Sequence, residues 1–300
     1  MTYRHGTPFA LLALSLIAAI GCSARDRAEP DAAGDEIVAE LAEALSLHAS
    51  FDHGPDADFA LGDGQLYTVA PDTERDQAQP GIGNPDVELL ASGGRFGGAL
   101  QFNERNRHAI FYRAVDNVSF NENGWSGAIS FWLNLTPDED LADSYCDPIQ
   151  ITDMSYDDAA VWVDFTRDNP RQFRLGVFGD REAWNPEQLS SDDYPFFFER
   201  LVIVNDPPFQ RGEWTHVVVT YSDLNSESGG SARLYLNGVL QGTTPDIDEA
   251  FTWDLANAEI RIGVNYIGLY DELALFNRPL SEAEVGALHE LEGGVAQLHR

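Results

Sequence analysis

The stretch between residues 180 and 198 combines aromatic rings with charged groups and turn-forming residues. It reads DREAWNPEQLSSDDYPFFF and places Trp184 and Tyr194 near arginine and aspartate side chains. An exposed aromatic ring beside carboxylates can stack on a sugar while the carboxylates accept hydrogen bonds from its hydroxyls. The alternative is inward packing, which we expect for at least two of the three phenylalanines at 196–198. Trp184 and Tyr194 are therefore the predicted ligand-binding residues.

Catalytic chemistry has little support in the residue pattern. All 18 cations are arginine, so the chain has no lysine for a P-loop, a Schiff base or a lysine general base. The motifs Gly-x-Ser-x-Gly, His-Glu-x-x-His, Cys-x-x-Cys and Gly-x-Gly-x-x-Gly do not occur. His216 alternates with valines in a strand-like run, so a structural role is favoured over catalysis. These observations favour binding over catalysis.

The charge balance restricts the possible partners. Fifty acidic residues against 18 arginines give a formal net charge of −32. Binding to nucleic acid or to an anionic membrane surface requires clustered cations, so both are disfavoured. The chain is 43% hydrophobic and 11% aromatic, which is typical of a folded protein.

Residues 1–21 are predicted to be a lipoprotein-type signal peptide. Their apolar run, Phe9–Ile20, has 12 apolar or small residues and is too short to span a bilayer. The following Ala19-Ile20-Gly21-Cys22 resembles a bacterial lipobox, which implies lipidation of Cys22; the alternative is ordinary cleavage that leaves this thiol unmodified. Ser23 favours the outer membrane of the cell envelope. Because the protein is so acidic, attachment to a membrane has to come from the lipid alone.

The fate of the second cysteine depends on the first. Cys146 can pair with Cys22 only if Cys22 carries no lipid. If Cys22 is lipidated, Cys146 is expected to be a buried thiol.

Most of the remaining sequence has the pattern of an antiparallel β-protein. Residues 22–46 form a tether and a short amphipathic helix, the β-rich region covers 47–292, and 293–300 form a tail. Asn237-Gly238 between two apolar runs indicates a tight hairpin, and Ser281 with Glu284 indicates a helix-capping box. Predicted strands lie at 47–52, 99–102, 108–112, 128–135, 147–152, 160–165, 172–178, 200–204, 214–221, 232–236, 239–243, 259–263 and 268–276. This spacing is typical of a sandwich or jelly roll.

Several segments resemble, in order and spacing, the laminin G-like members of the concanavalin A-like lectin/glucanase superfamily. They are Phe96–Phe102 (FGGALQF), Gly127–Trp132 (GAISFW), Trp214–Tyr221 (WTHVVVTY), Leu234–Gly238 (LYLNG), Gly268–Phe276 (GLYDELALF) and Pro279–Ser281 (PLS). The resemblance implies an all-β, concanavalin A-like jelly-roll sandwich of two antiparallel sheets with a short C-terminal helix. It also implies that 136–160 and 180–200 are insertions.

The resemblance further implies a calcium site where the first and last strands approach each other. Asp271 would supply the carboxylate, and Phe51 or Asp52 and a glycine near Gly98 would supply further oxygens, which are the ligands that Ca²⁺ prefers. The alternative is that Asp271 caps a turn or pairs with Arg278. The glucanases of the superfamily carry Glu-x-Asp-x-(x)-Glu on one strand, whereas Asp164 has no glutamate two or four positions away.

The sequence therefore predicts a secreted, lipid-anchored and non-catalytic binding module for carbohydrate or a cell-envelope component. Two alternatives remain: a diverged polysaccharide hydrolase or lyase, and a protein-binding adhesin or scaffold lipoprotein. The ligand itself cannot be inferred from the fold.

Overall fold

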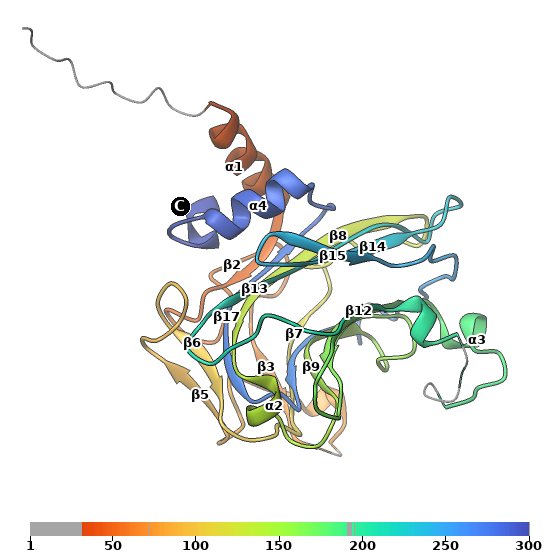
Figure 1. Cartoon of the computed structure of the whole chain (residues 1–300), viewed down its shortest axis with the longest axis horizontal. Coiled ribbons are helices and arrows are strands. Elements are labelled where there is room, and N and C mark those ends of the chain that lie inside the picture. The colour runs from red at the N-terminus through yellow and green to blue at the C-terminus, as the bar shows by residue number, and fades with distance from the viewer. Residues whose placement is uncertain (1–31, 72, 191–193, 195, 300) are drawn as a thin grey trace, which may run out of the picture.

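The computed structural model describes residues 32–71, 73–190, 194 and 196–299. Their strands form two antiparallel sheets that face each other, so the predicted all-β jelly-roll sandwich is confirmed (Figure 1). The predicted signal segment 1–21 and Cys22 lie outside the described residues. Among the helices described, none is long and apolar enough to cross a bilayer.

Sheet A contains nine strands within the described residues, in the order β15-β14-β13-β8-β17-β1-β2, with β6 beside β17 and β5 beside β6. Their bounds are β1 Leu45–Ala49, β2 Phe59–Ala60, β5 Val87–Leu90, β6 Ala99–Phe102, β8 Trp125–Asn134, β13 Thr215–Leu224, β14 Ser231–Leu236, β15 Val239–Thr243 and β17 Gly268–Phe276. The first long strand, β1, pairs with the last, β17, as the resemblance implied.

Sheet B contains eight strands within the described residues, in the order β12-β11-β10-β9-β16-β7-β3-β4. Their bounds are β3 Tyr67–Val69, β4 Gln79–Pro80, β7 Ala109–Arg113, β9 Cys146–Thr152, β10 Ala160–Phe165, β11 Phe173–Phe178, β12 Val202–Val204 and β16 Glu259–Val264. Every predicted strand overlaps an observed one, whereas the short strands β2, β3, β4 and β5 were not predicted.

The main core lies between the two sheets. Ile129 and Phe131 of β8 pack inward against Val161 and Val163 of β10, and all four are fully buried. Residues at the alternate positions, such as Ala128 and Trp162, belong to separate clusters on the outer faces. Successive side chains of a strand point to opposite faces, so each sheet presents a second surface that something else has to cover.

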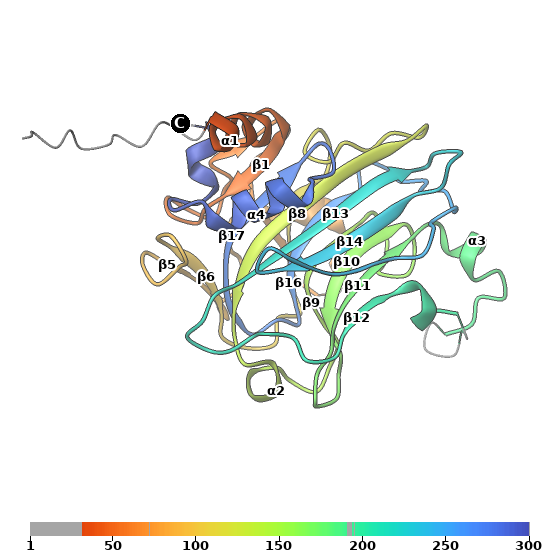
Figure 2. The same ribbon diagram turned by 45° about the horizontal axis from the view of Figure 1, so that its top comes forward.

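Helices cover the outer face of sheet A. Helix α1 (Ala32–Ala44), which includes most of the predicted helix, packs beside α4 (Glu282–Glu290), as Figures 1 and 2 show. The predicted capping box is present, because Ser281 Oγ accepts from the N–H of Glu284 and Glu284 Oε2 accepts from the N–H of Ser281. The 3₁₀ helix η4 (Val295–His299) also packs here, with Val295 and Leu298 buried.

The outer face of sheet B is covered only in part. The short helix α3 (Arg181–Trp184) and the 3₁₀ helix η3 (Phe198–Arg200) belong to the predicted insertion at 180–200 and lie at one side of the sheet (Figure 2). The remaining short helices of the described chain are α2 (Pro137–Asp140) and η1 (Arg75–Gln77). Strands β9, β10, β11 and β16 therefore present a polar surface next to this insertion.

Candidate functional site

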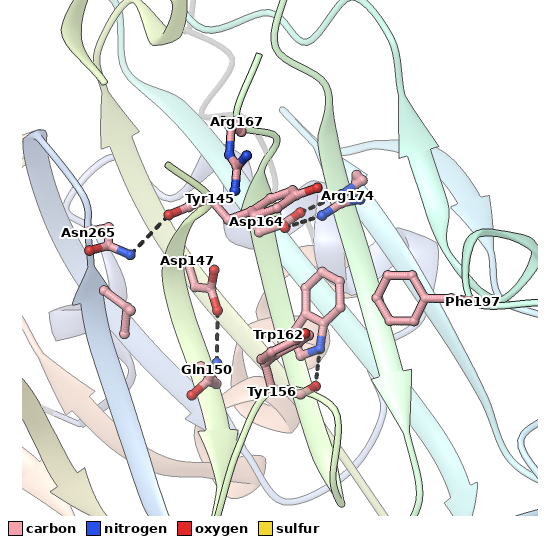
Figure 3. A pocket seen from close by; sticks show the side chains of 11 residues that line it. Tyr145, Asp147, Gln150, Tyr156, Trp162, Asp164, Arg167, Arg174, Phe197 and Asn265 are labelled. Atoms are coloured by element: carbon pink, nitrogen blue, oxygen red, sulfur yellow. Dashed lines mark hydrogen bonds and ion pairs between the residues drawn. The ribbon is translucent and has the colours of Figure 1, made fainter. Parts of the chain in front are cut away.

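A cavity of about 370 Å³ lies on the outer face of sheet B, above strands β9, β10, β11 and β16 (Figure 3). It is lined by Tyr145, Asp147, Gln150, Tyr156, Trp162, Asp164, Arg167, Arg174, Phe197, Val264 and Asn265. The strands position these side chains because their neighbours in sequence, such as Val163 and Leu175, point into the core. Aromatic rings beside a few convergent polar groups are typical of small-ligand sites.

Asp164 and Arg174 form a buried ion pair across the floor of the cavity. They face each other in the β10–β11 register, and each side chain is about 4–5% exposed. The guanidinium donates through Nε to Asp164 Oδ1 at 2.8 Å and through Nη2 to Oδ2, so the pair is bidentate. The guanidinium carbon lies 5.2 Å from the ring centroid of Tyr145 and 5.8 Å from that of Trp162. The pair therefore joins two strands and contacts two aromatic walls of the cavity.

Asp147 has a different environment in the same cavity. It is half-buried, and its Oδ2 accepts a hydrogen bond from Gln150 Nε2 at 2.8 Å. Burial, together with the nearby Asp164 carboxylate, raises the pKa of Asp147 well above its usual value. The cavity thus holds two acidic groups: Asp164 is neutralised by Arg174, whereas Asp147 forms no ion pair with a described residue.

Trp162 forms the aromatic wall beside the insertion. Its indole N–H donates to the carbonyl of Tyr156 at 2.7 Å, and its ring stacks against Phe178 and Phe197. Directly across the strand pair stands Gly176, where an added Cβ would lie 2.2 Å from the indole ring. A glycine is therefore needed at this position for the indole to lie flat on β11.

The prediction that Trp184 is an exposed ligand platform is wrong. Its side chain is 3% exposed and packs on Phe178, with ring centroids 4.9 Å apart, and its indole N–H donates to the carbonyl of Asp157. Tyr194 is half-buried against Trp184, at 5.5 Å between ring centroids. The outer face of β10 and β11 has an apolar part around Trp162 and Phe178, and Trp184 and Phe197 of the insertion cover it. Phe196 and Phe198 are exposed, so the expected inward packing of at least two of the three phenylalanines at 196–198 is wrong. Neither predicted residue lines the cavity, but Phe197 of the same insertion does.

Asp52 and Asp271 both contact the glycine-rich segment at 94–98. Asp52 Oδ1 accepts from the N–H of Gly98 at 2.6 Å. Asp271 is buried, and its Oδ2 accepts from the N–H of Arg95 at 2.6 Å. Burial and the neighbouring Glu272 raise the pKa of Asp271 to about 8. The alternative of an Asp271–Arg278 pair does not hold, because Arg278 pairs with Glu284.

The backbone around Asp271 is packed closely enough to gather oxygen atoms. A Cβ added to Gly94 would lie 1.6 Å from the carbonyl oxygen of Gly98 and 2.7 Å from Asp271 Oδ2, and one added to Gly98 would lie 2.4 Å from the carbonyl oxygen of Phe51. Among the described residues, no group of three or more histidine, cysteine or acidic side chains is arranged to hold a metal. A cation held here would therefore depend on Asp271 and backbone carbonyls, which suits Ca²⁺.

Cys146 is buried at the start of β9 and forms no disulfide with any residue that the structure describes. Burial raises its pKa well above the usual value, so the reactive thiolate is disfavoured. The predicted burial of Cys146 is confirmed, whereas the alternative of a pair with Cys22 concerns a residue outside the described part of the chain.

Sequence reasoning did not find the residues that line the cavity. Trp162, Asp164 and Arg174 lie in predicted strands, and the signal that could have singled them out is the placement of polar or bulky groups between core valines and leucines. In an antiparallel strand with this alternation, the apolar residues face the core and the polar residues face outward, where a ligand can reach them.

Comparison with known proteins bears on the fold. A sequence model of the concanavalin A-like lectin/glucanases superfamily (Laminin_G_3) matches residues 109–286, more than half of the chain. Among curated proteins, none matches the sequence.

The similar solved structures are distant in sequence. Domain 4 of an extracellular arabinanase from Geobacillus stearothermophilus, in complex with arabinotriose, is 18% identical, with a TM-score of 0.48 over 82% of this chain and 100% of that domain. The botulinum neurotoxin type G receptor binding domain is 14% identical, with a TM-score of 0.51 over 83% of this chain and 51% of that one. For the botulinum mosaic serotype C/D receptor binding domain the identity is 12%, with a TM-score of 0.52 over 84% and 52%. The chain spans about half the length of these toxin domains, and the likeness concerns the fold alone.

Proposed function

This chain belongs to the concanavalin A-like lectin/glucanase superfamily, and on that premise we propose that it is a secreted, lipid-anchored, non-catalytic module that binds carbohydrate or another cell-envelope component. The observation that carries the proposal is the cavity on sheet B, where Tyr145, Tyr156 and Trp162 surround hydrogen-bonding groups of Asp147 and Gln150. Sugars are bound by this combination, because their hydroxyls need polar partners and their C–H faces pack on rings.

The state of the carboxylates supports binding over hydrolysis. A glycosidase needs one carboxyl group to protonate the leaving group and a second to attack or to activate water. Asp164 directs both of its oxygens to Arg174 in a buried pair. The bidentate contact with the guanidinium stabilises the ionised form of Asp164, which disfavours a role as the proton donor.

A glycan array probed with the purified chain tests the proposal. Tyr156 is 43% exposed at the rim of the cavity, so Tyr156→Ala removes a stacking surface with little effect on the core. We expect this variant to bind its glycan about tenfold more weakly, which corresponds to about 1.4 kcal/mol. Leu240→Ala is the matched control, because Leu240 is equally exposed on β15 of the other sheet. Array binding that is absent, or that Tyr156→Ala leaves unchanged, would contradict this assignment.

The enzyme alternative is tested on the same glycans by measuring the release of reducing ends. If the chain releases them and Asp147→Asn abolishes the release, the proposal of a non-catalytic module is wrong.

The lipid anchor rests on Cys22. We expect Cys22→Ser to move the protein from the outer-membrane fraction to the soluble fraction, since the acidic surface offers no other attachment to anionic lipid. A variant that remains in the membrane fraction would exclude this anchor.

Calcium binding rests on Asp271 and the carbonyls of the glycine-rich segment. A buried carboxylate beside Glu272 gains from a cation, which would add a further link where β17 already contacts β1 and the segment at 94–98. The melting temperature is expected to fall when a chelator is added to the native chain. Identical melting with calcium and with chelator would refute the site.

A further inference from the structure

The charges that line the cavity on sheet B are unevenly neutralised. Arg174 is paired with Asp164, and Arg167, which is 55% exposed, lies at the rim within 4.0 Å of Asp143. Beside the cavity, on the same outer face of sheet B, Arg261 donates to Glu259 and to Gln150. Asp147 forms no ion pair with any described residue, although its side chain is half-buried and faces the cavity (Figure 3). The cavity therefore has one acidic group available to a cation from outside.

The walls around Asp147 also suit a cation. Tyr145, Trp162, Tyr156 and Phe197 all border the cavity, and ring faces attract positive charge through their quadrupoles. Two of these rings already contact a guanidinium within the cavity, that of Arg174. A carboxylate surrounded by aromatic rings is the combination that proteins use to hold an ammonium group.

The charge of the whole chain acts in the same direction. At a net charge of −32 the protein repels polyanionic glycans and attracts cations before contact is made. Arg167, Arg174 and Arg261 do not reverse this field, because each forms an ion pair with an aspartate or a glutamate. A neutral glycan would gain nothing from this field, whereas a cationic one would associate faster.

We propose that the ligand is a glycan with free amino groups, whose protonated amine is held by Asp147 while its ring packs on the aromatic walls. This inference rests on the proposed carbohydrate-binding function and names its ligand class. Replacing the amine by an acetamide removes the positive charge and leaves the ring unchanged. A charge-assisted hydrogen bond in a partly buried site changes affinity by about ten- to hundredfold.

Titration calorimetry with a glucosamine trimer and an N-acetylglucosamine trimer, at pH 6.5 and low salt, tests the inference. The native chain is expected to bind the free amine at least tenfold more tightly. Asp147→Asn keeps the shape of the side chain and its contact with Gln150, and is expected to abolish the preference. Asp143→Asn is the matched control at the exposed rim and is expected to preserve it.

The pH dependence gives a second readout. Asp147 faces Asp164 from β10, Arg174 from β11 and Arg261 from β16, and it holds a proton to a higher pH than an ordinary aspartate does. Binding of the ammonium group requires the ionised form of Asp147, so affinity for the glucosamine trimer is expected to fall as the pH is lowered, and to do so at a higher pH than an ordinary aspartate would give. In Asp147→Asn this decline is expected to disappear.

The outcomes distinguish failure of the amino-sugar specificity from failure of carbohydrate binding itself. Equal affinity for both trimers, or a preference that survives in Asp147→Asn, overturns the inference and leaves carbohydrate binding intact. Failure of both trimers, with Tyr156-dependent binding of another glycan on the array, also overturns it. If no glycan binds in a Tyr156-dependent way, the proposed function fails as well.

Discussion

Removal of the Arg174 guanidinium is expected to destabilise the protein more than any other single change in the cavity. Arg174→Met keeps an unbranched side chain on β11 but leaves the Asp164 carboxylate, about 5% exposed, without its cation. Removing one partner of a buried ion pair typically costs about 3–5 kcal/mol, because the remaining charge is desolvated and uncompensated. Lost contact with the faces of Tyr145 and Trp162 adds to this in the same direction.

This cost is measurable by urea or thermal unfolding followed by circular dichroism at pH 7. For a domain of this size it corresponds to a decrease in melting temperature of roughly 10 °C. Arg167→Met is the matched control. That arginine is 55% exposed and 4.0 Å from an exposed aspartate, so its loss is expected to change the free energy of unfolding by less than about 0.5 kcal/mol.

A double variant separates the loss of the pair from the loss of packing. Asp164→Leu with Arg174→Met replaces both charges by apolar groups of similar size, and such replacements are often neutral or stabilising. We expect the double variant to recover most of the stability that Arg174→Met loses. If Arg174→Met costs no more than Arg167→Met, the pair is not desolvated and the reasoning is refuted.

Three further changes have defined outcomes. Gly176→Ala places a Cβ within 2.2 Å of Trp162 and is expected to lower the free energy of unfolding by about 1–3 kcal/mol. In the control Gly286→Ala, on α4, the added Cβ meets open space, so the free energy of unfolding is expected to rise by about 0.5–1 kcal/mol. Ser281→Ala removes the N-cap of α4 and is expected to cost about 1 kcal/mol in the same assay. The folded-state pKa of Asp271 is about 8, above its unfolded value. Without calcium, its contribution to stability is therefore present at low pH and lost as the pH rises toward 8. Melting temperatures at pH 5 and pH 8, with calcium or with chelator, check this.

The fold could be predicted because its long strands have clear sequence signals. Val217–Val219 in β13 and Val161–Val163 in β10 are apolar runs rich in β-branched residues, which favour strands. The four missed strands have two to four residues each, and β4, at the edge of sheet B, even contains Pro80. A proline is tolerated at an edge because its missing N–H has no partner to lose. Strands this short depend on their neighbours and have no signal of their own.

The role of Trp184 could not be predicted from its own neighbours. Arg181, Glu182 and Asn185 surround it in sequence, which indicates an exposed turn. The aromatic residues that bury it, Phe178 and Phe197, lie before and after this turn and meet only because the insertion folds back on β11. Trp184 is therefore buried by contacts with Phe178 and Phe197, which are distant from it in sequence, and not by its immediate neighbours.

Asp147 was missed because β9 contains an irregularity that reverses its alternation. In the register with β10, Cys146 pairs with Phe165 and Ile149 with Val163, so two residues of β9 stand opposite Asp164 alone. Cys146 and Ile149 therefore both point into the core although three positions separate them, and Asp147 and Gln150 both face the cavity. A strict two-residue period would place Asp147 and Gln150 on opposite faces.

The sequence does contain one trace of this bulge. Pro148 interrupts the run Cys146–Thr152, and within a sheet proline is confined to edges, first positions and bulges. Because β9 lies between β10 and β16, an edge is excluded once the topology is known, and the bulge remains. A search along single strands for paired carboxylates could not find Asp147 and Asp164, since it is the register across this bulge that brings them to one face.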